Sequence, residues 1–277
     1  MGDADDAGVL SQRLPQRQRH KVTLRHLKVL RVTDLSPSMR RVALGGPELE
    51  GFVSLGFDDH VKMFFPAPGE AKPILPIVGP DGLTFPEHGP RPLARDFTPR
   101  RHDRLAGELD IDFALRHEGP ASHWAAAAKP GDSAWVAGPR GSFIVPFNFD
   151  WHLLIADETG LPALARRLEE LPEGGKAIAL VEVADAREEL SLYRSGGSAV
   201  IWAHRAEGME PGVALLAALR TLDLPAGDYF AWIACESDAA KQLRGVLVDE
   251  RGANRKWVRA HGYWRRGSVA VHDDFDA

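Results

Sequence analysis

The spacing of apolar residues changes near Asp150, and this change constrains the fold more than any other feature of the chain. Before it, short segments alternate apolar and polar residues between glycines and prolines, which is typical of antiparallel β-structure. After it, short apolar segments take turns with stretches of helical spacing, which predicts a parallel sheet covered by helices on both faces. We therefore expect a β half followed by an α/β half.

The β half is expected to span residues 21–147, after a flexible polar tail at 1–20 that carries Arg13, Arg17 and Arg19. Eight prolines between Pro66 and Pro92 predict a long irregular loop, because proline lacks an amide hydrogen and breaks regular structure. The predicted strands are Lys21–Thr33, Met39–Gly45, His60–Phe65, Glu108–Leu115 and Ser133–Ala137.

The α/β half is expected to span residues 148–277. Its predicted strands are Trp151–Ala156, Ala177–Val183, Ala199–Ala203, Tyr229–Cys235 and Trp257–Tyr263, and its helices begin at Leu161 and cover Gly212–Leu222 and about Asp238–Asp249. In open parallel sheets, ligands bind at the carboxyl ends of the strands. The segments 157–160 and 234–237, which follow the first and fourth of these strands, are expected to flank one crevice, although Asp157 and Glu158 would repel a phosphate.

The composition excludes several classes of site. The formal net charge of -5 gives no general argument for binding nucleic acid. Cys235 is the single cysteine, so an internal disulfide and a cysteine-rich metal site are excluded. No apolar run approaches the ~20 residues of a membrane span. Met1–Ser11 is acidic and lacks the order of a signal peptide, so we expect a cytoplasmic protein.

The stretch Arg95-Asp96-Phe97-Thr98 is a candidate ligand site in the β half. In an extended chain, Arg95 and Phe97 face one way, and Asp96 and Thr98 face the other. These residues would suit a ligand that has a flat polar ring system and a pyrophosphate tail. The aromatic ring could stack on the ligand, the hydroxyl could bond to a heteroatom and the guanidinium could bind the phosphates. The alternative is an edge strand with solvated charges.

A second candidate begins at Gly119-Pro120-Ala121-Ser122, where a tight turn leads into an alanine-rich helix that ends near Lys129. Backbone amides at the start of a helix form an anion site, and small side chains allow a ligand to approach closely. The alternative is a surface turn that Ser122 caps.

Other familiar motifs are absent from the sequence. It contains no glycine-rich dinucleotide loop, no Walker sequence, no Gly-x-Ser-x-Gly and no His-x-x-x-His on a predicted helix. Cys235 ends an apolar strand with no cation beside it, which indicates a structural thiol. We expect no metal site.

Taken together, these segments resemble the siderophore-interacting proteins, a family of flavin-dependent ferric-siderophore reductases in the ferredoxin–NADP reductase superfamily. The resemblance spans roughly Lys21 to Gly267. The segments that carry it are Arg95-Asp96-Phe97-Thr98-x-Arg100, Glu108-Leu109-Asp110-Ile111-Asp112-Phe113, Gly119-Pro120-Ala121-Ser122-x-Trp124-Ala125, Gly131-Asp132, Asp157-Glu158-Thr159 and Gly262-Tyr263-Trp264-Arg265-Arg266-Gly267.

The resemblance implies a six-stranded antiparallel FAD-binding β-barrel followed by an α/β domain with a parallel sheet that binds NAD(P)H. By position, Arg95 would contact the FAD phosphates, Phe97 would stack on the isoalloxazine and Thr98 would hydrogen-bond near its N5 atom. The family usually has tyrosine at Phe97, so stacking survives but the hydrogen bond of the phenol is lost. The other expected cofactor contacts are Asp96, Arg100, His117, Gly119, Pro120, Ala121, Ser122, Asp157, Thr159 and Glu236.

The resemblance also implies a function: electrons pass from NAD(P)H, or from a ferredoxin, through FAD to a ferric siderophore, and iron leaves as Fe(II). A cationic lip would hold the anionic complex beside the flavin. Beside Thr98, the matching catalytic candidates are Lys62, Arg140, Arg265 and Arg266, although the last two also fit a solvated pair. We expect a monomer without nucleic-acid partners.

Two other functions are compatible with the same residues. One is a carrier or sensor that binds FAD and has a degenerate α/β half. The other is a general flavin or ferric reductase without preference for siderophores.

Overall fold

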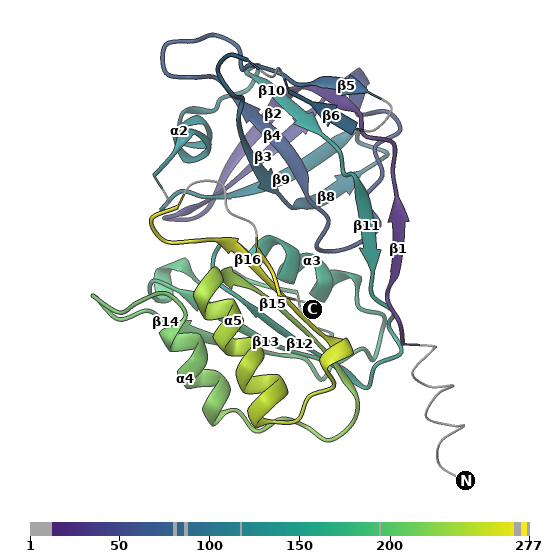
Figure 1. Ribbon diagram of the computed structural model, residues 1–277, viewed down its shortest axis with the longest axis vertical. Coiled ribbons are helices and arrows are strands. Elements are labelled where there is room, and N and C mark those ends of the chain that lie inside the picture. The colour runs from purple at the N-terminus through teal and green to yellow at the C-terminus, as the bar shows by residue number, and fades with distance from the viewer. Residues whose placement is uncertain are drawn as a thin grey trace. The chain divides into compact units, whose positions relative to one another are not determined.

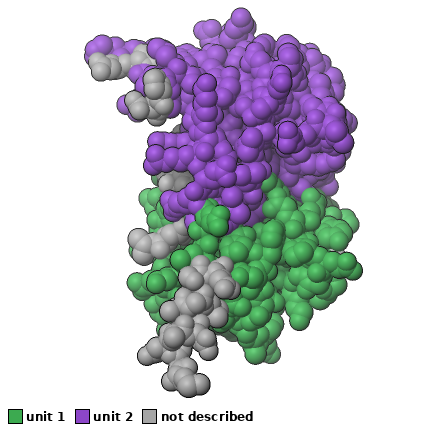
Figure 2. Space-filling view, turned by 90° about the vertical axis from the view of Figure 1, so that its right-hand side faces the viewer, with its two compact units in different colours: residues 1–16, 145–277 green, residues 17–144 purple. Residues whose placement is uncertain are grey.

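The computed structural model describes residues 13–79, 82–85, 88–116, 118–193, 195–268 and 273–275 (Figure 1). The chain folds into two compact units, which Figure 2 shows in different colours. One unit is Arg17–Ile144, here called the β unit. The other, the α/β unit, is formed by Val145–Ala277 together with residues that precede Arg17.

The β unit is built on a seven-stranded antiparallel sheet with the order β7-β4-β10-β2-β3-β9-β8. The two strands at its edges are consecutive in the chain and are linked by Thr98 alone. The sheet therefore curls so that its edges approach each other. Its strands are β2 Leu24–Ser36, β3 Met39–Gly45, β4 Val61–Phe65, β7 Leu93–Phe97, β8 Pro99–Asp103, β9 Glu108–Ala114 and β10 Ser133–Ala137.

The sheet has seven strands where the resemblance implied six. The additional strand arises because the chain is divided at Thr98 into β7, which pairs with β4, and β8, which pairs with β9 at the other edge of the sheet. Pro99 favours this division because it has no amide hydrogen to donate. The short helices of this unit are η1, Pro47–Leu49, and α2, Pro120–Ala127. The interior is apolar, and β9 contributes Leu109, Ile111 and Phe113 to it on alternate positions, as predicted.

Two further strand pairs correct the predictions for irregular segments. Gln16–Arg19, which we expected in a flexible tail, forms β1 and pairs with β11, Gly141–Ile144. The segment rich in proline contains a hairpin of β5, Ile77–Gly79, and β6, Gly82–Thr84. The prediction of a wholly irregular loop was wrong because the prolines flank these short strands and do not interrupt them.

The α/β unit has a six-stranded sheet with the order β14-β13-β12-β15-β16-β17. The first five strands are parallel, and short β17 is antiparallel to β16. Its strands are β12 Trp151–Ala156, β13 Ala177–Val183, β14 Ala199–His204, β15 Tyr229–Glu236, β16 Val258–Trp264 and β17 Asp273–Asp274. The strand order reverses direction between β12 and β15, which is where doubly wound sheets bind nucleotides.

Helices cover both faces of this sheet, with α4 and α5 on one face and α3 on the other (Figure 1). The helices are α3 Leu161–Glu170, η2 Ala186–Glu188, α4 Val213–Thr221, α5 Ser237–Gly245, the π-helical turn η3 Val246–Glu250 and η4 Arg255–Trp257. Among the described residues, none of these helices is long and apolar enough to cross a membrane.

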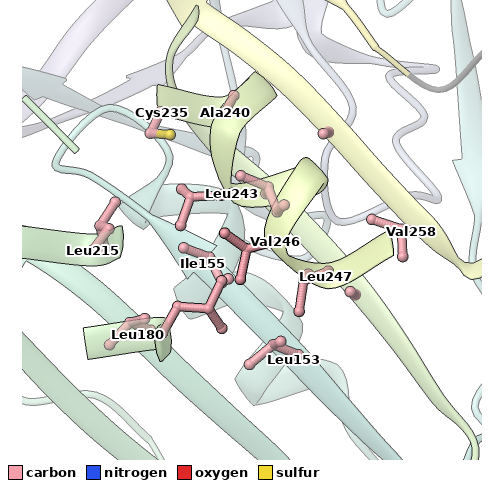
Figure 3. Packing of buried hydrophobic residues seen from close by; sticks show 14 of the residues in the cluster. Leu153, Ile155, Leu180, Leu215, Cys235, Ala240, Leu243, Val246, Leu247 and Val258 are labelled. Atoms are coloured by element: carbon pink, nitrogen blue, oxygen red, sulfur yellow. The ribbon is translucent and has the colours of Figure 1, made fainter. Parts of the chain in front are cut away.

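The core under α4 and α5 contains Cys235 among apolar side chains such as Leu215 and Leu243 (Figure 3). Only 1% of Cys235 is exposed, and burial raises the pKa of its thiol well above the ordinary value. The thiol is therefore protonated and packs as a small apolar group, as the sequence indicated.

Candidate functional site

Four aromatic rings bring the two candidate motifs of the β unit together. The Phe97 ring of β7 lies 4.5 Å from the ring of Phe113 and 6.1 Å from that of Phe65, measured between centroids. Trp124 of α2 lies 5.7 Å from Phe113 and 5.8 Å from Phe65. The stretch at 95–98 and the turn at Gly119 therefore lie on elements that pack on one cluster.

The register of β4 and β7 confirms how the side chains of this stretch alternate. Arg95 pairs with Met63, and Asp96 pairs with Lys62 on the opposite face. Lys62 Nζ lies 2.6 Å from Asp96 Oδ1, so each neutralises the other. Arg95 and Phe97 share the remaining face and are partly buried. This face therefore offers a cation and a ring, whereas Asp96 is engaged by Lys62.

Arg95 and Thr98 both have unused hydrogen-bonding capacity. The guanidinium of Arg95 donates to the carbonyl of Ala94, at 2.7 Å from Nη1, and has no carboxylate in ion-pair range in the part of the chain that the structure describes. Burial lowers the pKa of Arg95, an effect that Asp96 opposes. Thr98 is 7% exposed, and its hydroxyl has no hydrogen-bond partner among the described residues. Both groups could serve a ligand that supplies an anion and a heteroatom.

Arg100 lies in a buried ionic network between strands. Its Nε is 3.9 Å from Asp112 Oδ2. Asp112 also accepts two hydrogen bonds from Arg41 of β3, at 2.7 and 2.8 Å. Arg100 therefore helps to join β8, β9 and β3, and its expected contact with a cofactor stays a prediction.

The N-terminus of α2 is open to an anion. The helix begins at Pro120, and the cap position is occupied by Gly119, which has no side chain, so no side chain of the described residues caps the first turn from this position. The first turn contains no acidic residue, and a Cβ atom added at Gly119 would meet no atom within 4 Å. The cap residue is thus Gly119 and not Ser122. Backbone amides that have no acceptor within the helix and the positive end of the helix dipole would both favour a pyrophosphate.

The four cationic candidates differ in their partners. Three are paired with carboxylates: Lys62 with Asp96, Arg265 with Asp273 and Arg266 with Glu210. Arg140 is exposed and has no ion-pair partner among the described residues. Its charge is therefore available to an anionic ligand, whereas the other three would have to exchange a carboxylate for it. His117, another expected contact, lies outside the described residues.

Asp157 joins three strand ends at the carboxyl edge of the α/β sheet. Its Oδ1 accepts hydrogen bonds from the amide and the hydroxyl of Thr159, at 2.8 and 2.6 Å. Its Oδ2 accepts from Trp264 Nε1 at 2.8 Å and from the amide of Glu236 at 3.1 Å. Burial, together with neighbouring Glu158, raises the pKa of Asp157 to about 6. The carboxylate thus holds the ends of β12, β15 and β16 together.

The other predicted nucleotide contacts at this edge also stabilise loops. Glu236 Oε2 accepts from the amides of Asp238 and Ala239, at 2.7 and 3.1 Å, and so caps α5. The hydroxyl of Thr159 is used by Asp157. Contacts of these side chains with a nucleotide therefore stay predictions. The hydrogen bonds that they make fix the loop after β12 and the start of α5.

Sequence reasoning missed an ion cluster at the same edge. Arg205 lies 3.0 Å from Glu158 Oε2 and 2.8 Å from Glu182 Oε1. Glu182 is fully buried and also accepts from the amide of Gly212. Burial would lower the pKa of Arg205, but the two carboxylates raise it above its ordinary value. In the sequence, this cluster could have been suspected from Glu182, a glutamate inside an otherwise apolar strand.

The chain matches known proteins over nearly its whole length. Residues 28–143 match the model of the siderophore-interacting FAD-binding domain, and residues 149–267 match that of the siderophore-interacting protein. It is 43% identical to the NADPH-dependent ferric-chelate reductase of Escherichia coli over 91% of this chain and 97% of the relative. It is 31% identical to the ferric vibriobactin reductase ViuB of Vibrio cholerae, over 92% and 94% of the two chains.

A solved structure shows the same fold. The siderophore utilization protein from T. fusca superposes with a TM-score of 0.86 at 41% identity, covering 93% of this chain and 98% of that one. The residues that carried the resemblance in the sequence lie within the matched ranges. The chain belongs to the siderophore-interacting protein family.

Proposed function

We propose that this chain is an FAD-dependent ferric-siderophore reductase that takes its electrons from NADPH. The observation that carries the proposal is a set of unused groups in the β unit. Among the residues that the structure describes, Arg95 has no carboxylate partner, the Thr98 hydroxyl has no hydrogen-bond partner and no side chain caps the turn at Gly119. The names of the relatives, which are ferric-chelate and ferric vibriobactin reductases, support the same chemistry.

The residues present fit FAD. The partly buried Phe97 provides a flat apolar surface for the isoalloxazine, and Thr98 provides a hydrogen bond at its edge. Arg95 and the amides of the first turn of α2 provide the positive charge and donors that a pyrophosphate needs. When bound, FAD supplies a carrier that takes two electrons from a nicotinamide and passes them on singly, as Fe(III) requires.

The protein's part in iron release is to hold the ferric complex without binding iron. Ferric siderophores are often anionic, so the exposed positive charge of Arg140 would attract them. Lys62, Arg265 and Arg266 are paired with carboxylates and would bind the ferric complex by exchanging that carboxylate for it. Such exposed ion pairs are weak, so the exchange costs about 1 kcal/mol or less each. Reduction weakens the complex, because Fe(II) is a softer cation than Fe(III). We place this activity in the cytoplasm, where the reduced thiol of Cys235 would persist.

Anaerobic addition of NADPH to the FAD-loaded protein should bleach the visible flavin absorption, and a ferric siderophore should then restore it. A chelator specific for Fe(II) provides a second measurement of the product. Absence of bleaching with NADPH and with NADH would support the carrier or sensor, or a ferredoxin donor. Equal rates with a panel of unrelated ferric chelates would instead support the general reductase.

Arg187 is our candidate for the choice of NADPH over NADH. It follows β13 in η2, and Asp185 holds it through Nε and Nη2 at 3.0 and 2.8 Å while 80% of its side chain stays exposed. At this place in doubly wound sheets, an arginine accommodates the 2′-phosphate of NADPH. Arg187→Ala should lower kcat/KM for NADPH about five- to tenfold, as expected for one exposed charged contact, and leave that for NADH unchanged.

Arg220→Ala is the matched control for Arg187, because Arg220 is also exposed and paired with a carboxylate, that of Glu250. This control should leave both coenzymes unaffected. An equal loss of kcat/KM for NADPH and NADH in Arg187→Ala would show that the residue does not recognise the 2′-phosphate.

A further inference from the structure

The C-terminal end of α2 is held by a side chain from outside the helix, that of Arg40 in β3. Arg40 Nη1 donates to the carbonyl oxygens of Ala126 and Ala125, at 2.6 and 3.2 Å. Its Nε donates to Asp34 Oδ1 at 2.6 Å, and Asp34 faces Arg40 directly across the β2–β3 pair. The planar guanidinium of Arg40 thus joins the β2–β3 pair to the C-terminal end of α2.

The helix needs such support because it is short. It has eight residues, and isolated helices of this length are unstable in water. Its last carbonyls have no partner within the helix, and its last turn contains no basic residue of its own. Arg40 supplies both the donors and the positive charge that a helix C-terminus favours. Packing of Trp124 and Ala125 on the core supplies the rest.

We propose that Arg40 is a positioning residue for the FAD pyrophosphate. It contacts the C-terminal carbonyls of α2, and through the helix it fixes the direction of the backbone at the N-terminal turn that begins at Gly119. The inference rests on the proposed function, because it takes the N-terminus of α2 as the pyrophosphate site. Since hydrogen bonds depend steeply on direction, loosening one end of so short a helix should weaken phosphate binding at the other.

The test compares two ligands that differ in the pyrophosphate. FAD and riboflavin share the isoalloxazine ring, but riboflavin has neither the phosphates nor the adenosine. In the full-length apoprotein, Arg40→Ala should lower the affinity for FAD by about tenfold, as for the loss of a charged cap, and leave riboflavin affinity unchanged. Arg40→Lys, which keeps the charge but cannot bridge both partners, should show an intermediate loss.

Arg31→Ala provides the matched control. Arg31 lies on β2, is exposed and pairs with Glu108 at 3.0 Å across the sheet. This variant should bind both ligands like the unaltered protein. Equal losses of FAD and riboflavin affinity in Arg40→Ala would show a general structural role and overturn the inference, as would no loss of FAD affinity.

Hydrogen exchange of the apoprotein gives a second readout that needs no ligand. Amides of residues 120–127 should exchange faster in Arg40→Ala than in Arg31→Ala, whereas the strands of the α/β unit should not change. Unchanged exchange in α2 would overturn the inference even if riboflavin bound too weakly to measure. Failure of the unaltered protein to bind FAD would instead contradict the proposed function.

Discussion

Phe97→Leu should lower the affinity for FAD by about tenfold while the β unit stays folded. Leucine can fill most of the space beside Phe113 and Phe65, but it has no flat ring for the isoalloxazine. Stacking on an aromatic side chain contributes about 1–3 kcal/mol, which corresponds to a loss of this order. Titration of the apoprotein with FAD, followed by flavin fluorescence, measures the change.

Two further variants separate stacking from packing at this position. Phe97→Ala should lose FAD as well, but it should also lower the midpoint of thermal unfolding, because it leaves a cavity in the ring cluster. Phe97→Tyr restores the residue that is usual in the family and should bind FAD at least as tightly as the natural chain. FAD content equal to that of the natural chain in both Phe97→Leu and Phe97→Ala would remove Phe97 from the stacking role.

The strands were predictable wherever burial has a regular period. Met39–Gly45, Ser133–Ala137, Trp151–Ala156 and Ala177–Val183 form with the predicted bounds. In each case apolar residues face a core, so the pattern of the sequence records the environment directly. The same reasoning placed Arg95 and Phe97 on one face, which the register of β4 and β7 confirms.

Short strands that depend on distant partners were not predictable. β1 is polar throughout, and it forms because β11, far along the chain, offers an open edge. The hairpin of β5 and β6 lies among prolines whose positions, and not their number, decide where a strand can form. Local composition does not contain this information, because it depends on contacts between segments.

The carboxyl edge of the α/β sheet illustrates the same limit for a site. In the sequence, Asp157 and Glu158 indicated repulsion of a phosphate. In the structure, Asp157 accepts bonds from Trp264 of β16, and Glu158 pairs with Arg205, which follows β14. These partners come from strands that are distant in sequence and lie two places from β12 on either side of it in the sheet, so the spacing of residues could not reveal them.

Arg205→Leu should destabilise the α/β unit by about 3–5 kcal/mol, the usual cost of leaving a buried charge without its partner. Arg205 is the cation shared by Glu158 and Glu182, whose side chains are 6% and 0% exposed. Without it, two buried carboxylates would face each other, and the donors to Glu182 that remain among the described residues are the amides of Gly212 and Leu215. Urea unfolding of the full-length apoprotein, followed by tryptophan fluorescence, measures the loss.

Glu158→Gln is the matched control, because it leaves Arg205 and Glu182 as a simple pair and should cost much less than Arg205→Leu. The double variant should recover part of the loss, since one of the unpaired carboxylates is then absent. A loss in Arg205→Leu no larger than in Glu158→Gln would show that the cluster does not stabilise the fold.

The pH dependence gives the cluster a signature of its own. In Arg205→Leu, Glu158 and Glu182 are buried without a cation, and burial disfavours the charged form of a carboxyl group. Low pH therefore favours the folded variant relative to its unfolded chain, and its stability falls as the pH rises. The difference from the natural chain should therefore be small near pH 4 and large at pH 7. A deficit that does not depend on pH would mean that leucine disturbs packing, and that charge pairing by Arg205 is not what keeps this edge of the sheet folded.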